Sequence, residues 1–206
     1  MQHRNLLWIA LAALWLGGCG GDKSGPVPPP PGIVQVVAEA PLDAHWYGMN
    51  LLPNGHFTNW THGQPTPADF EAPDPRYSQV GSAGGTVRQT WTQSDLVQQR
   101  DAQFRGRAAL RAGVDYEFIA LAETRGDGIA SIGMWLTSGR DEPEMVEPTL
   151  LTLLPGQGML KKYAAPFRVP ENGTYEFTSH AVVTPEETLE VVWHRWHIVE
   201  TTGDAR

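Results

Sequence analysis

The chain of 206 residues is poor in three features, and each absence narrows its function. It has one cysteine, Cys19, which excludes an intrachain disulfide, a CxxC redox pair and a zinc site built from several cysteines. Its longest apolar run, Leu6 to Leu16, has eleven residues and is too short to cross roughly 30 Å of membrane hydrocarbon as a helix. It has no long basic run, and its formal net charge of −8 argues against nucleic acid as a partner.

The N-terminus has the layout of a signal peptide over residues 1–18. Arg4 supplies a positive charge, an apolar stretch follows it, and two glycines precede Cys19. The sequence LGGC at 16–19 resembles the lipobox of bacterial lipoproteins. The resemblance implies that Cys19 becomes the mature N-terminus and carries lipid, palmitate included, that anchors the protein in a membrane. Residue 20 is glycine rather than aspartate, which implies an outer-membrane destination in a bacterial cell envelope. The alternative is an ordinary secretory leader with a chance cysteine.

Residues 19–32 are predicted to be a Gly/Pro-rich linker that begins at the lipid anchor. Five prolines fall between positions 26 and 31, and such a stretch adopts the extended polyproline II conformation. At about 3.1 Å per residue, the linker reaches on the order of 30–40 Å. Residues 33–206 then form one globular domain, which is large enough to bury a core without a metal or a disulfide.

Residues 44–201 show alternation of apolar and polar side chains rather than a helical stripe. Asn172-Gly173 lies between two of the alternating segments and is a strong turn signal, because this pair tolerates positive φ. Short strands separated by turns predict an all-β fold, a jelly-roll β-sandwich of two antiparallel sheets. The expected strands are 86–92, 115–124, 129–137, 163–169, 174–183 and 189–200, and 95–105 is expected to be a helical turn or a polar loop.

The segment 50–57, NLLPNGHF, followed by Trp60, resembles the opening strand of galactose-binding-like jelly rolls. This family includes carbohydrate-binding modules of glycoside hydrolases. Residues 110–123 and 167–170 are similar to later strands of the same fold, so the resemblance covers most of 47–200. It implies the fold more than the function, because sandwiches carry many unrelated activities.

Metal binding is not expected. Many relatives hold a structural calcium with carboxylates, but His56 and Thr58 stand at the matching positions of the first motif, so neither calcium nor another cofactor is expected. His194 and His197 are three residues apart, so on a regular strand they point to opposite faces and cannot share one zinc ion. A zinc site made of His56, His194 and a carboxylate stays open as an alternative to a buried histidine pair.

Trp135 is the main candidate for ligand binding. Residues 132, 134 and 136 of its segment are apolar, so Trp135 points to the opposite side, among small and polar residues. His180 projects away from the apolar side of its own segment in the same way. An indole plate beside hydrogen-bonding groups suits a sugar ring, and Trp60 and Trp91 would join the site if they lie near the same surface. The alternative places Trp135 under a loop or beneath residues 33–43.

No catalytic residue is expected. No serine lies in a G-x-S-x-G elbow, lipid occupies the only thiol, and no spacing identifies a carboxylate dyad. The sequence therefore predicts a membrane-anchored, non-catalytic module that binds a glycan or another surface ligand. The alternative is a structural or assembly protein that docks an envelope or phage virion component.

Overall fold

The computed structural model describes residues 48–71, 75–83, 85–96, 100, 103–153 and 155–201. The signal peptide, Cys19, the linker and residues 33–47 lie outside the described residues, so what the sequence indicates for them stays a prediction. This includes the domain boundaries. Within the described ranges there is no α-helix, and hence none that is long and apolar enough to cross a membrane.

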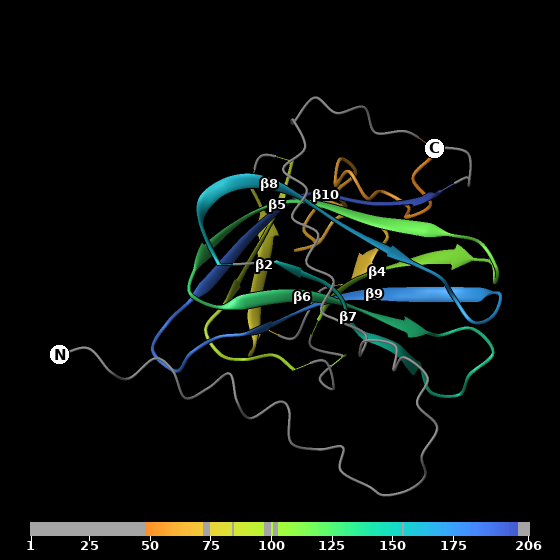
Figure 1. Ribbon diagram of the computed structural model, residues 1–206. Coiled ribbons are helices and arrows are strands. Elements are labelled where there is room, and N and C mark those ends of the chain that lie inside the picture. The colour runs from red at the N-terminus through yellow and green to blue at the C-terminus, as the bar shows by residue number, and fades with distance from the viewer. Residues whose placement is uncertain are drawn as a thin grey trace, which may run out of the picture. The chain divides into compact units, whose positions relative to one another are not determined.

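The described residues form ten strands in two five-stranded antiparallel sheets that face each other (Figure 1). The order β1-β4-β9-β6-β7 makes the first sheet and β2-β3-β10-β5-β8 makes the second sheet. The predicted all-β sandwich is therefore confirmed. The strands are β1 (Phe70–Glu71), β2 (Ser78–Ser82), β3 (Val87–Trp91), β4 (Phe104–Leu110), β5 (Tyr116–Gly126), β6 (Ile129–Leu136), β7 (Glu144–Leu153), β8 (Gly156–Phe167), β9 (Gly173–Val182) and β10 (Leu189–Glu200).

The chain crosses from one sheet to the other at most of its connections. The chain passes from the second sheet to the first between β3 and β4, between β5 and β6, and between β8 and β9. It returns to the second sheet between β4 and β5, between β7 and β8, and between β9 and β10. The Asn172-Gly173 turn accordingly joins β8 of the second sheet to β9 of the first, and neither residue has positive φ. Instead, the Asn172 side chain accepts a hydrogen bond from the Ala112 amide at 2.8 Å. The pair thus marks a crossover and not a tight hairpin turn.

The inward faces of the two sheets meet in an aromatic core. The rings of Phe70 and Phe104 stack with centroids 5.0 Å apart, and Trp196 meets Phe104 edge-on at 5.2 Å. Phe57, from the segment before β1, contacts Phe70 at 5.1 Å. Burial of about 150 Å² per ring is worth up to about 4 kcal/mol at 25 cal/mol per Å². These rings therefore fix the separation of the sheets.

A β-bulge in β10 changes which side chains point inward. The register against β5 shifts between Trp193 and Arg195, so one extra residue is inserted there. Trp193 and Trp196 are both fully buried, with ring centroids 5.3 Å apart. Strict alternation would put residues three apart on opposite faces, but the bulge turns both tryptophans into the core. For the same reason His194 and His197 both lie on the outer side of the second sheet.

The segment 50–57 resembles an opening strand in sequence, but it folds as a series of turns. Asn54 has a φ of 48° and Phe57 a φ of 56°, and such left-handed residues end extended structure. The side chain of Asn50 holds the segment beside β10, donating to the Trp196 carbonyl at 2.9 Å and accepting from the Ile198 amide at 2.9 Å. The segment 50–57 is therefore not the expected strand but a turn-rich segment that Asn50 attaches to β10 by hydrogen bonds.

Strands β7 and β8 are edge strands, and both carry features that disturb pairing. The register of β7 against β6 breaks twice, and Pro148 removes a backbone donor. β8 contains Lys161, Lys162 and Pro166. Charges, prolines and bulges of this kind make an edge a poor template for another strand.

Candidate ligand-binding face

The outer face of the first sheet, which points away from the core, gathers polar and aromatic side chains from four strands. Alternation places these residues there, because their neighbours in β4, β6 and β9 point into the core. The face has a mixed character, with charged groups toward β4 and an aromatic and apolar part toward β7. Its members are Arg105, Arg107, Ser131, Gly133, Trp135, Met145, Glu176, Thr178 and His180.

Trp135 lies on this outer face, as alternation in its strand predicted. Cross-strand pairing sets it opposite Glu176 of β9 on one side and Met145 of β7 on the other. The Trp135 side chain is half-buried, whereas Met145 is 43% exposed. The indole and the thioether therefore form an apolar strip at the solvent boundary. The ligand-binding role of Trp135 stays a prediction.

Two buried polar atoms on this face have no hydrogen-bond partner among the residues that the structure describes. Trp135 Nε1 is buried without a hydrogen bond, and so is the hydroxyl of Thr178. Gly133 faces Thr178 across the strands and has no side chain of its own. Because nearly all buried polar atoms in proteins are paired, partners beyond the described residues are expected here, such as water or ligand hydroxyl groups.

A network of guanidinium and carboxylate groups occupies the other half of the face. Glu176 is fully buried, and Arg100 Nη2 and Arg107 Nε each donate to its Oε2 at 2.9 Å. Arg107 also reaches Glu71 Oε1 at 2.7 Å, so one guanidinium joins the two carboxylates. Arg105 donates to Glu71 Oε2 at 2.6 Å. Charge-assisted contacts of this type hold planar groups in fixed directions.

The network opens to solvent at its β1 end. The side chains of Arg107 and Glu71 are 45% and 40% exposed, and a groove of about 340 Å³ begins beside them. Burial acts to raise the pKa of Glu71, but the hydrogen bonds and charges of Arg105 and Arg107 lower it overall. A glycosidase general acid must hold a proton near neutral pH, so Glu71 is unsuited to that role. The groove is lined by Pro53, Asp69, Phe70, Glu71, Arg105 and Arg107.

His180 lies on the same outer face as Trp135, but at a distance from it. Its cross-strand partner is Ser131, four residues along β6 from Trp135, which corresponds to about 13 Å. The ring is 8% exposed, and its Nε2 lies 3.0 Å from the Pro148 carbonyl. Burial lowers the pKa of His180, although the hydrogen bond to Pro148 acts in the opposite direction. The structure therefore places a neutral, anchored imidazole here.

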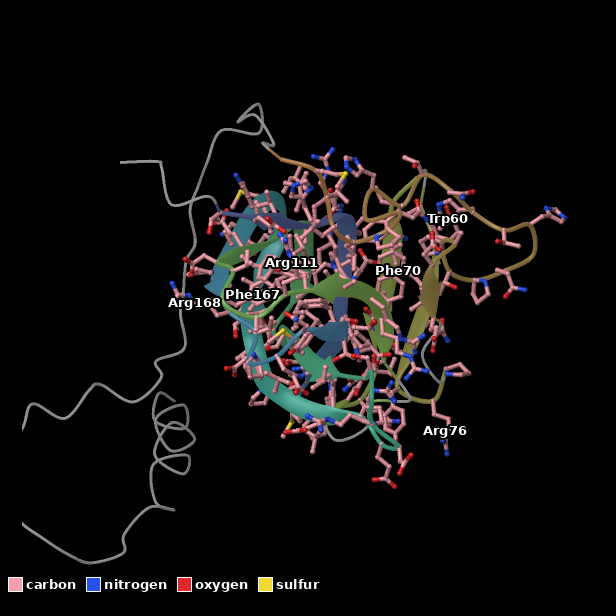
Figure 2. All side chains as sticks on the ribbon, turned by 90° about the vertical axis from the view of Figure 1, so that its right-hand side faces the viewer. Trp60, Phe70, Arg76, Arg111, Phe167 and Arg168 are labelled. Atoms are coloured by element: carbon pink, nitrogen blue, oxygen red, sulfur yellow. The ribbon has the colours of Figure 1, made fainter. Side chains whose placement is uncertain are left out.

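The other two predicted tryptophans do not lie beside Trp135. Trp91 is fully buried in the core, and its Nε1 points to Asp95 Oδ2 at 3.4 Å, so its expected place at a ligand-binding surface is wrong. Trp60 is half-buried in the loop before β1, where its Nε1 donates to the Phe57 carbonyl at 2.6 Å. Figure 2 shows Trp60 on the same side of the view as Phe70 of β1. β1 is three strands from β6, about 14 Å.

Three histidines lie on or beside β10, and two of them, His56 and His197, are close to each other. The rings of His56 and His197 meet edge-on with centroids 6.5 Å apart, and His194 Nε2 contacts Glu123 Oε1 at 2.9 Å. Burial and, to a smaller extent, the charge of Arg195 lower the pKa of His56. Among the described residues, no three His, Cys, Asp or Glu side chains are placed to share a metal ion.

Sequence reasoning missed the arginines of the outer face. The segment FRGRAAL at 104–110 places Arg105 and Arg107 two residues apart, with Phe104, Gly106 and Ala108 between and around them. This is a period-two pattern, and Glu176 alternates in the same way within β9. Opposite charges at such positions on two strands were the available signal for a cross-strand network.

No protein-family model matches the chain, and no curated protein does either. Among solved structures, a family 4 carbohydrate-binding module (CBM4) is 13% identical with a TM-score of 0.49, and the alignment covers 72% of this chain and 98% of that one. The CBM22-1–GH10 modules of xylanase 10B from Clostridium thermocellum, complexed with xylohexaose, are 11% identical with a TM-score of 0.47, over 77% of this chain and 29% of that one. TmCBM61 in complex with β-1,4-galactotriose is 12% identical with a TM-score of 0.41, over 75% of this chain and 100% of that one. At these identities and TM-scores, the likeness transfers neither a ligand nor a site residue to this chain.

Proposed function

We propose that this protein is a non-catalytic, membrane-anchored module that binds a glycan on the outer face of the first sheet. The observation that carries the proposal is the placement of Trp135 on this face, next to Met145 and in register with the charged row of Glu176 and Arg107. A sugar ring has an apolar C–H side and a rim of hydroxyl groups, so it needs both kinds of surface at once.

The geometry supplies both kinds of contact in one row across the sheet. The indole of Trp135 and the thioether of Met145 offer the apolar part. Arg107 and Glu71, both partly exposed, offer donors and acceptors whose directions are fixed by their mutual contact at 2.7 Å. Neighbouring strands lie about 4.8 Å apart, so four strands span about 14 Å, enough for two or three sugar rings.

The proposal is tested by glycan-array and affinity-gel binding of the purified full chain in detergent micelles. We expect Trp135→Ala to weaken binding about ten-fold or more, as for the central aromatic of an interface. Trp60→Ala removes an indole of the same size outside this face and serves as the matched control. The proposal fails if no glycan binds, or if the Trp135 and Trp60 variants bind equally well while both stay folded.

A second variant separates binding from folding. The Thr178 hydroxyl has no partner among the described residues, so Thr178→Val keeps the shape of the side chain and removes no hydrogen bond that the structure describes. We expect its free energy of unfolding to equal or exceed that of the parent, because a buried unpaired hydroxyl is costly. Weaker glycan binding by a variant of unchanged stability would assign the hydroxyl to the ligand. Unchanged binding would restrict the site to the Trp135 and Arg107 region.

The membrane anchor is the part of the proposal that rests on sequence alone. Lipid chains at Cys19 contribute about 0.8 kcal/mol for each buried methylene, so two or more chains hold a protein on a membrane. Radiolabelled palmitate should enter the parent chain and not Cys19→Ser, and cell fractionation should find the parent with the outer membrane. Equal labelling of both chains, or none in the parent, would remove the anchor from the proposal.

A second candidate function is supported by one exposed apolar pair on the same face. Ile129 and Val182 are cross-strand neighbours, 44% and 53% exposed. An apolar contact of this kind fits a protein partner, such as an envelope or virion component, better than a sugar. Ile129→Asp should abolish a stoichiometric cross-linked complex if this function is the correct one, and should leave glycan binding at Trp135 unchanged if it is not.

A further inference from the structure

The outer side of the second sheet carries a small apolar cluster that does not belong to the main core. Ile119 of β5, Ala164 of β8 and Val199 of β10 form it, on three adjacent strands. Ile119 and Ala164 are cross-strand partners, and the neighbours of all three side chains along their strands point into the core. Their exposed fractions are only 3%, 5% and 3%, values typical of an interior.

The described chain begins directly at this cluster. The backbone of Gly48 lies against the Val199 side chain, so closely that a Cβ at position 48 would overlap Val199 Cγ2. Gly48 has a φ of 82°, a conformation in which glycine is favoured and which turns the chain sharply. From Leu51 onward the chain follows β10, since the Leu51 amide donates to the Ile198 carbonyl at 2.9 Å. The described chain therefore enters the sheet at Val199.

The sequence before Gly48 has the composition needed to cover such a cluster. In IVQVVAEA, at 33–40, an extended segment would have an apolar side made of Val34, Val36 and Ala38, and a mixed side made of Ile33, Gln35, Val37 and Glu39. Fifteen residues lie between the linker and Gly48, and at about 3.3 Å each they span about 50 Å, more than the width of the sheet.

Charge also matches between the segment and the face. Glu39 and Asp43 give residues 33–47 two negative charges at pH 7. On the outer side of the second sheet, the row on one side of the cluster contains Lys162 and Arg195, each in register with Leu121 of β5, whereas Glu117 is in register with Val199 at the other side of the cluster. Opposite charges across a contact favour one docking orientation over others.

We infer that residues 33–47 pack across the outer side of the second sheet and cover the cluster of Ile119, Ala164 and Val199. The segment then belongs to the folded domain rather than to the linker. This inference does not depend on the glycan-binding proposal, because it concerns the sheet on the opposite side of the core.

The test uses Ala164→Cys in the full chain as a probe of the covered cluster. Maleimide modification at residue 164 is followed by mass spectrometry, which separates it from any modification at Cys19. In this background, Val34→Asp with Val36→Asp places two charges on the apolar side of the segment. The control, Ser24→Asp with Gln35→Asp, adds the same two charges, one in the linker and one at the polar residue of the mixed side.

We expect the thiol at 164 to react slowly in the parent and in the control, and about ten-fold or more faster in the Val34 and Val36 variant, because local opening exposes it. Equal rates in the two double variants would overturn the inference. So would labelling that slows as the protein concentration rises, since a second copy would then be the cover. If Ala164→Cys fails to fold, Val199→Cys probes the same cluster.

Discussion

Asp95 is a buried carboxyl group whose ionisation should make the stability of this protein depend on pH. It is fully buried between β3 and the end of β9, and its backbone pairs with that of Ala181. Burial raises its pKa from 3.8 to about 6, although the hydrogen bonds from Gln103 at 3.2 Å and Trp91 at 3.4 Å act in the opposite direction. The folded protein therefore binds this proton more tightly than the unfolded chain does.

The sign and the size of the effect follow from this difference in proton affinity. Between about pH 4 and pH 6 the folded state holds the proton and the unfolded state has lost it, so the free energy of unfolding falls as pH rises. A ten-fold difference in proton affinity corresponds to about 1.4 kcal/mol, so the contribution of Asp95 to stability falls by about 3 kcal/mol across this window. Above about pH 6 the contribution is constant.

Replacing Asp95 by Asn removes the titration and keeps the size of the side chain. The assay is urea unfolding followed by tryptophan fluorescence, between pH 4 and pH 7.5, on the parent, Asp95→Asn and Asp141→Asn. Asp141 is exposed, so its variant should follow the parent curve. The parent should lose about 3 kcal/mol relative to Asp95→Asn as pH rises through the window. Parallel curves for the parent and Asp95→Asn would refute the reasoning.

Three further substitutions, one of them with a matched control, test individual contacts in the two sheets. Glu176→Gln removes the buried negative charge that Arg100 and Arg107 contact, and it should lower the free energy of unfolding by about 3 kcal/mol, measured in urea. Asn50→Ala leaves the Ile198 amide without its acceptor; we expect a loss of about 2 kcal/mol and faster hydrogen exchange at that amide. Gly126 has a φ of 103°, and a Cβ there would overlap the backbone of Thr188, so Gly126→Ala should lower the free energy of unfolding by about 2 kcal/mol or more in thermal unfolding. Gly139 has a φ of 69° but open space around it, so its alanine variant should lose only about 1 kcal/mol. Unchanged exchange at residue 198, or equal losses for the two glycines, would contradict these assignments.

The sequence predicted the strands in which alternation is regular and missed those in which it is masked. β5, β6, β9 and β10 lie close to their expected ranges, because each has a run of apolar residues at every second position. The expected 163–169 is only the end of β8, which begins at Gly156. β4 was missed because its inward side chains include Gly106 and Ala108, too small to stand out between two arginines. In β7, bulges interrupt the alternation of apolar and polar residues from which a strand is predicted.

In the candidate site too, features set by a single strand could be predicted from the sequence, whereas features set by contacts between strands could not. The outward direction of Trp135 follows from its own strand, so it could be predicted. Trp91 was misjudged because its inward neighbour is polar: Gln89 is fully buried and accepts hydrogen bonds from Ser179 at 2.7 Å and Trp193 at 3.2 Å. The hydrogen bond between Ser179 and Gln89 joins the two sheets, so it cannot be predicted from the sequence of one short segment. The contacts of Arg107 with Glu71 and Glu176 likewise depend on strand order.

The edge strands of the two sheets affect whether neighbouring copies of the protein would pair when they are crowded together. Proteins tethered to a surface meet their neighbours far more often than the same number of molecules in solution, and always with similar orientations. An open strand edge under those conditions would recruit the next copy and begin a fibre. β8 carries two lysines and Pro166, and the irregular β7 carries Pro148, so neither edge offers a regular row of backbone groups for another strand to pair with. β1, at the other end of the first sheet, has only two residues. Three of the four sheet edges are therefore poor templates for the sheet of a neighbouring copy.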